Sequence, residues 1–145
     1  TRAVVAGEHS GYARLRCRAR HRRQVTLRRD LEVVVVEDIL SGRGEAGVEL
    51  RWHLGLPVRR GLPATLRERL TALEHELGPL AIDEALAIGD DVSCVLVRAA
   101  PDTMEVSIDE GLFSPGYGRV ETVPLVSYRG WLTFPKILKL FFIPV

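Results

Sequence analysis

Residues 31–40 read LEVVVVEDIL, and residues 48–54 read VELRWHL. The first run is apolar and β-branched on both faces, which is typical of a strand with a layer packed on each side. The second run alternates with a period of two, so that Val48, Leu50 and Trp52 share one face and polar side chains the other. Together the two runs predict a β protein whose core lies between sheets.

Further strands and turns extend this pattern. Met104, Val106 and Ile108 repeat the alternation. Turn signals rich in Gly, Pro, Ser and Asp separate the runs, at residues 41–44, 100–102 and 114–116. Many short strands joined by such turns predict an all-β, antiparallel, supersandwich-like β-sandwich. The apolar side chains expected to share its core include Val33, Val35, Leu50, Trp52, Val106 and Ile108.

One segment has a helical period instead. Leucines lie at helical spacing within residues 64–77, at positions 66, 70, 73 and 77. Pro63 precedes them, where its missing N–H costs nothing, and Gly78-Pro79 follows. We predict an amphipathic helix on a sheet face or edge. We interpret residues 59–91 as a helix-containing insertion in one domain that spans residues 1–145.

The composition suits a soluble globular core, with 145 residues, 46% hydrophobic and 27% charged. The net charge of +1 hides an asymmetry: residues 1–30 hold nine arginines against Glu8 and Asp30, whereas the remainder is acidic. This excess of arginine predicts a basic face that could meet an anionic partner. Because the overall charge is balanced and no nucleic-acid-binding motif occurs, no nucleic-acid partner is predicted.

The C-terminal stretch and the cysteines argue against a membrane-spanning segment and against a zinc or redox site. Residues 131–145 are apolar but too short to span a bilayer and are interrupted by Lys136 and Lys139, so we expect a packed final strand. Cys17 and Cys94 lack the spacing of a zinc site or redox motif, and we interpret them as small buried side chains, with a disulfide left open. No metal site or cofactor is predicted within the chain.

Several short motifs occur in a characteristic order. They are Gly11-Tyr12-Ala13-Arg14-Leu15, His21-Arg22-Arg23, the apolar run 31–40, Arg51-Trp52-His53 and Gly111-Leu112-Phe113-Ser114-Pro115-Gly116-Tyr117-Gly118. In this order and at these separations they resemble the later part of the β-sandwich of heparinase II/III-like polysaccharide lyases. The resemblance covers most of the chain, with a gap around residues 60–90.

The resemblance implies a function for a larger protein. Members of that family cleave acidic polysaccharides by β-elimination, with catalytic residues from an α-helical toroid and from the start of the sandwich. The His-x-His and His-Asn stretches of that start are absent, since no two of the four histidines lie closer than twelve residues and the chain has no Asn. We therefore expect a C-terminal piece of a lyase for uronic-acid-containing polysaccharide, inactive alone, with its catalytic residues upstream. Metal use by the parent protein stays open.

The resemblance also implies partners and a compartment. The partners are an acidic polysaccharide and the upstream toroid domain, and export to the periplasm or exterior is expected from the family. The alternative is a non-catalytic carbohydrate-binding or structural sandwich. The sequence upstream of residue 1 would distinguish the two.

Arginines occupy every second position at residues 14, 16, 18, 20 and 22. If one strand runs through, they form a ladder of guanidiniums that could pair with carboxylate or sulfate. A turn near residues 16–19, which the resemblance implies, would instead put His21 and Arg23 on the face of Arg14 and Arg16. The same arginines could also be a solvated face or protect a sheet edge.

The residues expected to bind substrate are Arg14, His21, Arg22, Arg23, Arg51 and His53. His53 shares the polar face of its strand with Arg51 and could line a groove, or it could be structural. Tyr12 and Tyr117, compared as bases for β-elimination, are both interpreted as structural, with Tyr117 packed on a strand.

Overall fold

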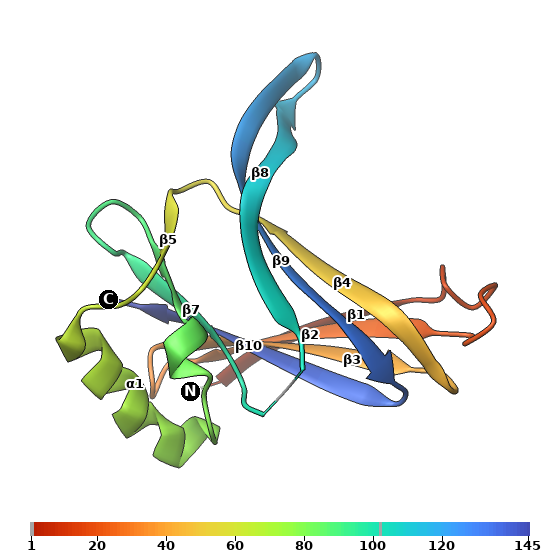
Figure 1. The fold of residues 1–145 in the computed structure, drawn as a ribbon, viewed down its shortest axis with the longest axis horizontal. Coiled ribbons are helices and arrows are strands. Elements are labelled where there is room, and N and C mark those ends of the chain that lie inside the picture. Colours follow the sequence, from red (N-terminus) through yellow and green to blue (C-terminus); the bar gives the residue numbers. More distant parts are fainter. Residues whose placement is uncertain (1, 102) are drawn as a thin grey trace.

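The computed structural model describes residues 2–101 and 103–145 (Figure 1). Its strands are β1 (Arg2–His9), β2 (Arg20–Arg28), β3 (Val33–Ser41), β4 (Glu45–His53), β5 (Val58–Arg60), β6 (Leu86–Ile88), β7 (Cys94–Arg98), β8 (Glu105–Gly116), β9 (Arg119–Thr133) and β10 (Lys136–Pro144). Its helices are α1 (Ala64–Leu77) and the short 3-10 helix η1 (Ile82–Glu84).

The strands form two sheets. One has seven strands in the order β1-β2-β3-β10-β7-β6-β5, and the other has three in the order β4-β9-β8. The pairings between neighbouring strands are antiparallel in both sheets. Hydrophobic side chains of the two sheets meet in one buried cluster, which includes Leu40, Leu96 and Leu140 from the large sheet and Leu50 and Val126 from the small one. The predicted antiparallel sandwich is confirmed.

The central strands are covered on both faces, as residues 31–40 predicted. In β3, Val36 and Leu40 join the cluster between the sheets, whereas Val33 joins a second cluster on the other side. Strand β10 pairs with both β3 and β7, and its side chains also alternate between the two clusters. Its Leu140 faces the small sheet and its Phe141 faces the helix side.

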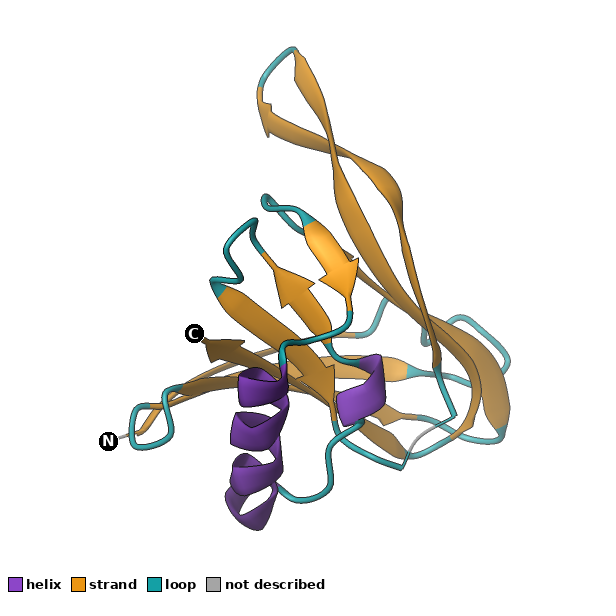
Figure 2. Cartoon of the chain, turned by 60° about the vertical axis from the view of Figure 1, so that its left-hand side comes forward, coloured by secondary structure: helices purple, strands orange, loops and turns teal. Residues whose placement is uncertain are grey.

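Helix α1 covers the outer face of the large sheet (Figure 2). Its bounds agree with the prediction. Leu70 is 1% exposed in the second cluster, and Leu66, Leu73 and Leu77 pack against that cluster. The helix ends at Leu77 and is capped by Gly78, whose positive φ of 83° favours glycine and whose N–H donates to the Glu74 carbonyl. Strands β5 and β6 flank α1 in sequence and form the edge of the sheet, while the interpretation of residues 59–91 as an insertion stays a prediction.

Three details of the prediction were wrong. Val33 and Val35 do not share a core with Leu50 but face the helix, since Val34 and Val36 are the residues of this run that point toward the small sheet. Residues 131–145 are not one strand, because β9 ends at Thr133 and β10 begins at Lys136. Trp131, which was expected to lie in this packed strand, is instead 67% exposed on β9.

The outer half of the β8–β9 hairpin projects from the sandwich (Figure 1). The motif that begins at Gly111 lies on this arm. Exposed apolar side chains gather along it, at Leu112, Phe113, Tyr117 and Val120. Tyr117 therefore does not pack on a strand as predicted, because the hairpin carries it beyond the small sheet. Among residues 2–101 and 103–145, no helix has both the length and the apolar character that a bilayer crossing requires.

Candidate functional site

A pocket of about 350 Å³ lies between the β1–β2 loop, the start of β2 and strand β4. We call it the inter-sheet pocket. Its apolar lining includes Leu15, Leu40 and Leu50, and its polar lining includes His21 and Arg23. The pocket therefore combines an apolar wall with a fixed cation, as sites for small ligands do.

Asp38 organises the polar wall of this pocket. It lies on β3 between Val36 and Leu40, on the face toward the small sheet, and its side chain is 1% exposed. Arg23 donates to it twice, from Nε to Oδ1 at 2.7 Å and from Nη2 to Oδ2 at 3.0 Å. His21 Nε2 lies 2.5 Å from Asp38 Oδ1. The strand register explains this arrangement, since Arg23 is the cross-strand neighbour of Asp38.

A chain of hydrogen bonds continues outward from Asp38. The Gly11 backbone N–H lies 3.3 Å from His9 Nδ1, and His9 Nε2 lies 3.3 Å from His21 Nδ1. Because a backbone N–H can only donate, His9 Nδ1 must accept. His9 Nε2 then donates to His21 Nδ1, and His21 Nε2 donates to the carboxylate. In this arrangement the donations run in one direction, from Gly11 through the two imidazoles to Asp38.

Aromatic rings support the two ends of this cluster. Tyr12 packs on His9 with ring centroids 5.1 Å apart. At the other end, the guanidinium carbon of Arg23 lies 4.4 Å from the centre of the Trp52 ring, and Trp52 in turn contacts Phe142. Such cation–π contact and the two hydrogen bonds to Asp38 fix the guanidinium plane. The charge of Arg23 is paired with Asp38, but its side chain remains 34% exposed, so its other N–H groups can donate to a ligand in the pocket.

Of the predicted binding residues, the structure brings three to the pocket. His21, Arg23 and Arg51 line it. Arg51 is exposed and pairs with Glu49, with Nε to Oε1 at 3.0 Å. Hydrogen bonds first from Arg51 and then from Arg129 lower the pKa of Glu49 to about 2. Arg51 is thus paired with a carboxylate from its own strand, which it shares with Arg129.

The other three predicted residues lie elsewhere. Arg22 is exposed and alternates with His21 and Arg23, so it points to the opposite face of β2. His53 lies against Gly111, where an added Cβ would come within 2.9 Å of the imidazole. Arg14 lies in the β1–β2 loop, and its Nε donates to the Gly11 carbonyl at 3.4 Å. These three side chains do not converge.

The predicted arginine ladder does not form. Strand β2 begins only at Arg20, and residues 11–17 form turns and a bend. Backbone hydrogen bonds from Ala13 N to the Ser10 carbonyl and from Leu15 N to the Tyr12 carbonyl close these turns. The chain does turn before β2, as the resemblance implied, but Arg14 lies in that turn and not in a strand whose face His21 could share. The exposure of these arginines agrees with the third alternative, a solvated surface.

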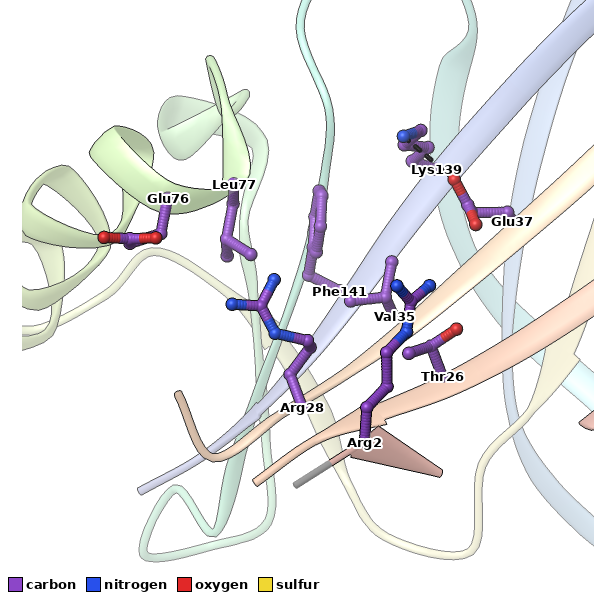
Figure 3. A pocket seen from close by; sticks show the side chains of 9 residues that line it. All are labelled: Arg2, Thr26, Arg28, Val35, Glu37, Glu76, Leu77, Lys139 and Phe141. Carbon is purple, nitrogen blue, oxygen red and sulfur yellow. Dashed lines mark ion pairs between the residues drawn. The ribbon is translucent and has the colours of Figure 1, made fainter. Parts of the chain in front are cut away.

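A second, smaller pocket of about 140 Å³ lies between α1 and the large sheet (Figure 3). Three cations line it. Lys139 Nζ pairs with Glu37 Oε1 at 2.9 Å, and Arg28 pairs with Asp30 at 2.7 Å. Since two of its three cations are already neutralised, we do not regard it as the main ligand site.

Metal and thiol chemistry have little support in the described part of the chain. No group of three or more His, Cys, Asp or Glu residues among residues 2–101 and 103–145 is placed to hold a metal ion. Cys17 and Cys94 are free and partly buried. Burial raises the pKa of the Cys94 thiol above its ordinary value.

Sequence reasoning missed Asp38, which organises the site. A signal existed, because Asp38 shares the period-two face of Val36 and Leu40 and a carboxylate on a core face needs a cationic partner. It also missed the contact of His9 with His21, since their separation of twelve positions gave no metal-ligand spacing. The register of β1 on β2, which pairs these two histidines, creates that contact.

The comparisons with known proteins agree with this fold. Residues 1–133 match the family described as "Heparinase II/III-like, C-terminal". A crystal structure of heparinase III superimposes with a TM-score of 0.60 at 17% identity, covering 99% of this chain and 20% of that one. A heparinase III with methylated lysines gives 0.58 at 18% identity, covering 98% of this chain and 19% of that one.

No curated protein matches the sequence significantly. The structural matches establish the fold, and the chain spans about a fifth of the length of those structures. The match over residues 1–133 confirms the resemblance carried by the short motifs. The chain belongs to the heparinase II/III-like C-terminal family.

Proposed function

We propose that this chain is the C-terminal β-sandwich part of a polysaccharide lyase that cleaves uronic-acid-containing polysaccharide by β-elimination. The observation that carries the proposal is the family match over residues 1–133, together with the fold shared with heparinase III. Because the chain spans about a fifth of those structures, the catalytic residues and an α-helical domain would belong to the rest of the protein. Export from the cytoplasm stays a prediction.

The inter-sheet pocket supports an ancillary part in this chemistry. β-Elimination needs a base for the C5 proton of the uronate, an acid for the leaving oxygen and a cation for the carboxylate. In the pocket, both ring nitrogens of His21 are engaged, one by Asp38 and one by His9. His21 could take a proton only by giving up one of these bonds. Arg23 is the cation nearest to this role, but Asp38 already pairs with it, so its remaining N–H donors can contribute to binding only.

The isolated chain should therefore be inactive. The test compares the 145-residue chain with the full-length gene product on heparin, heparan sulfate and alginate. Formation of the unsaturated product is followed by its ultraviolet absorbance. The full-length protein should release product from at least one substrate, and the isolated chain from none.

The full-length protein and the isolated chain can contradict the proposal in different ways. A full-length protein that cleaves none of a broad set of uronic-acid polysaccharides would overturn the lyase assignment. Product formed by the isolated chain would show instead that the active site lies within these residues, with His21 and Tyr12 as the first positions to substitute.

A further inference from the structure

Five arginines line an open groove on the β1–β2 loop. The groove has a volume of about 530 Å³, and we call it the arginine groove. The five are Arg14, Arg16, Arg18, Arg20 and Arg43, all of them exposed. Four come from the loop and the start of β2, and Arg43 comes from the turn between β3 and β4. The structure thus gathers into one concavity four arginines that the sequence pattern assigned to a strand face, together with Arg43 from a turn.

The backbone holds the two loops of this groove together. The Arg43 N–H donates to the Cys17 carbonyl at 2.9 Å. Gly42 permits this approach, because a Cβ at its position would lie 2.9 Å from the Cys17 oxygen. Arg18 has a φ of 49°, an unfavourable conformation for a non-glycine residue, and its N–H donates to the Leu15 carbonyl at 2.8 Å. Such strained residues persist where the surroundings fix them, and they gather at functional sites.

The charges of the groove are barely compensated. Among the described residues, no carboxylate forms an ion pair with Arg14, Arg16, Arg18 or Arg43, and Arg20 reaches Glu8 only at 3.9 Å. Several arginines elsewhere have a close carboxylate partner, such as Asp38 for Arg23 at 2.7 Å and Asp30 for Arg28 at 2.7 Å. Like charges held together without counter-charges raise the local potential and attract an anion.

We propose that the arginine groove binds the carboxylate and sulfate groups of an acidic glycan chain. This rests on the proposed function, which supplies such a glycan as substrate. Planar guanidinium forks pair bidentately with both groups, and several forks in one concavity can engage successive charges of a polymer. The volume lies within the range of roughly 300–1,000 Å³ typical of small-ligand sites, enough for a short stretch of chain.

The groove and the inter-sheet pocket are neighbours. Leu15 lines both of them. Tyr12, on the pocket side of the same loop, is 48% exposed and offers an apolar ring against which a sugar could lie. A glycan held by the groove could therefore extend past Tyr12 toward the Arg23 cation.

The test measures binding of heparin and alginate oligosaccharides, with a neutral dextran oligosaccharide as reference, by calorimetry on the purified chain. The charge-reversed variant is Arg16→Glu/Arg43→Glu. Its matched control is Arg29→Glu/Arg119→Glu, which changes the net charge equally at exposed positions outside the groove. We expect the first pair to weaken binding of the acidic oligosaccharides at least tenfold, and the control pair to change it less than twofold.

Binding should also weaken as salt rises from about 0.1 M to about 1 M, because the screening length falls from about 10 Å to about 3 Å. Circular dichroism and the unfolding midpoint check the fold, and Arg16→Gln/Arg43→Gln replaces the reversed pair if that pair unfolds. Absence of binding, equal losses in the groove and control variants, or equal binding of dextran would overturn the proposal.

A single-stranded oligonucleotide of similar charge is the last probe. If it binds more tightly than both acidic oligosaccharides, the groove is a site for another polyanion. These outcomes are separate from the lyase assay, because an inactive full-length protein would overturn the proposed function whether or not the groove binds an oligosaccharide.

Discussion

Replacing Asp38 by Asn should destabilise the domain more than any loss of an exposed carboxylate. The substitution keeps the shape of the side chain but removes its charge, and the new amide N–H₂ meets either the Arg23 donors or the His21 donor. Breaking one partner of a buried ion pair costs roughly 3–5 kcal/mol. Because Arg23 is 34% exposed and water can partly rehydrate it, we expect the lower end, about 3 kcal/mol. For a chain of this size that lowers the Tm by about 6–12 °C.

The assay is urea unfolding followed by tryptophan fluorescence, since Trp52 contacts Arg23. The matched control is Asp83→Asn, which removes a carboxylate that also pairs with an arginine, Arg67, but is 92% exposed. That control should cost about 1 kcal/mol or less. A combined Asp38→Leu/Arg23→Met variant should recover part of the stability, because it leaves no uncompensated buried charge. The reasoning is refuted if Asp38→Asn and Asp83→Asn cost the same.

Three further predictions concern the two cores and the outer face of the small sheet. Leu70→Ala should cost about 2–5 kcal/mol in urea unfolding, because Leu70 is 1% exposed, and a cost below about 1 kcal/mol would mean that α1 is not docked. Trp52→Ala should cost about 3 kcal/mol by the same measurement, with release of Arg23 adding to the lost packing, and a negligible cost would reverse the assignment of faces in β4. The lowered pKa of Glu49 stabilises the fold above its ordinary pKa of 4.5, and this contribution is lost as the pH falls toward about 2. Thermal unfolding between these pH values should therefore show a shallower loss of stability in Glu49→Gln than in the wild type, and identical slopes would contradict the Arg51 and Arg129 contacts.

Local patterns in the sequence were sufficient to predict individual elements of the fold. The leucine spacing and the flanking Pro63 and Gly78 predicted α1 with its bounds, because a helix is specified by contacts within one segment. The alternation in residues 48–54 predicted the buried face of β4 for the same reason. The faces of β3 could not be assigned in this way, because Val33 to Val36 are equally apolar and only the position of α1 decides which of them meets the helix.

The candidate site depended on long-range contacts that the sequence does not display. The arginines at alternate positions had the period of a strand, but successive hydrogen-bonded turns within residues 10–18 replace the strand there. Arg43 lies far from the other groove arginines in sequence and joins them only because β3 runs back antiparallel to β2. His21 and Arg23 were identified as site residues from motif resemblance, but their partner Asp38 required the register.

The position of β1 has a consequence for the dynamics of the site. Strand β1 is exposed along its whole length and, among the described residues, is held in the sheet by β2 alone. Its amides should therefore be among the first to exchange with solvent, by local opening rather than by global unfolding. Because β1 ends at His9, each such opening would also detach the outer histidine from His21. An occupied arginine groove would clamp the loop that follows β1, so ligand binding would be expected to slow this fraying and to order the hydrogen-bonded chain that leads to Asp38.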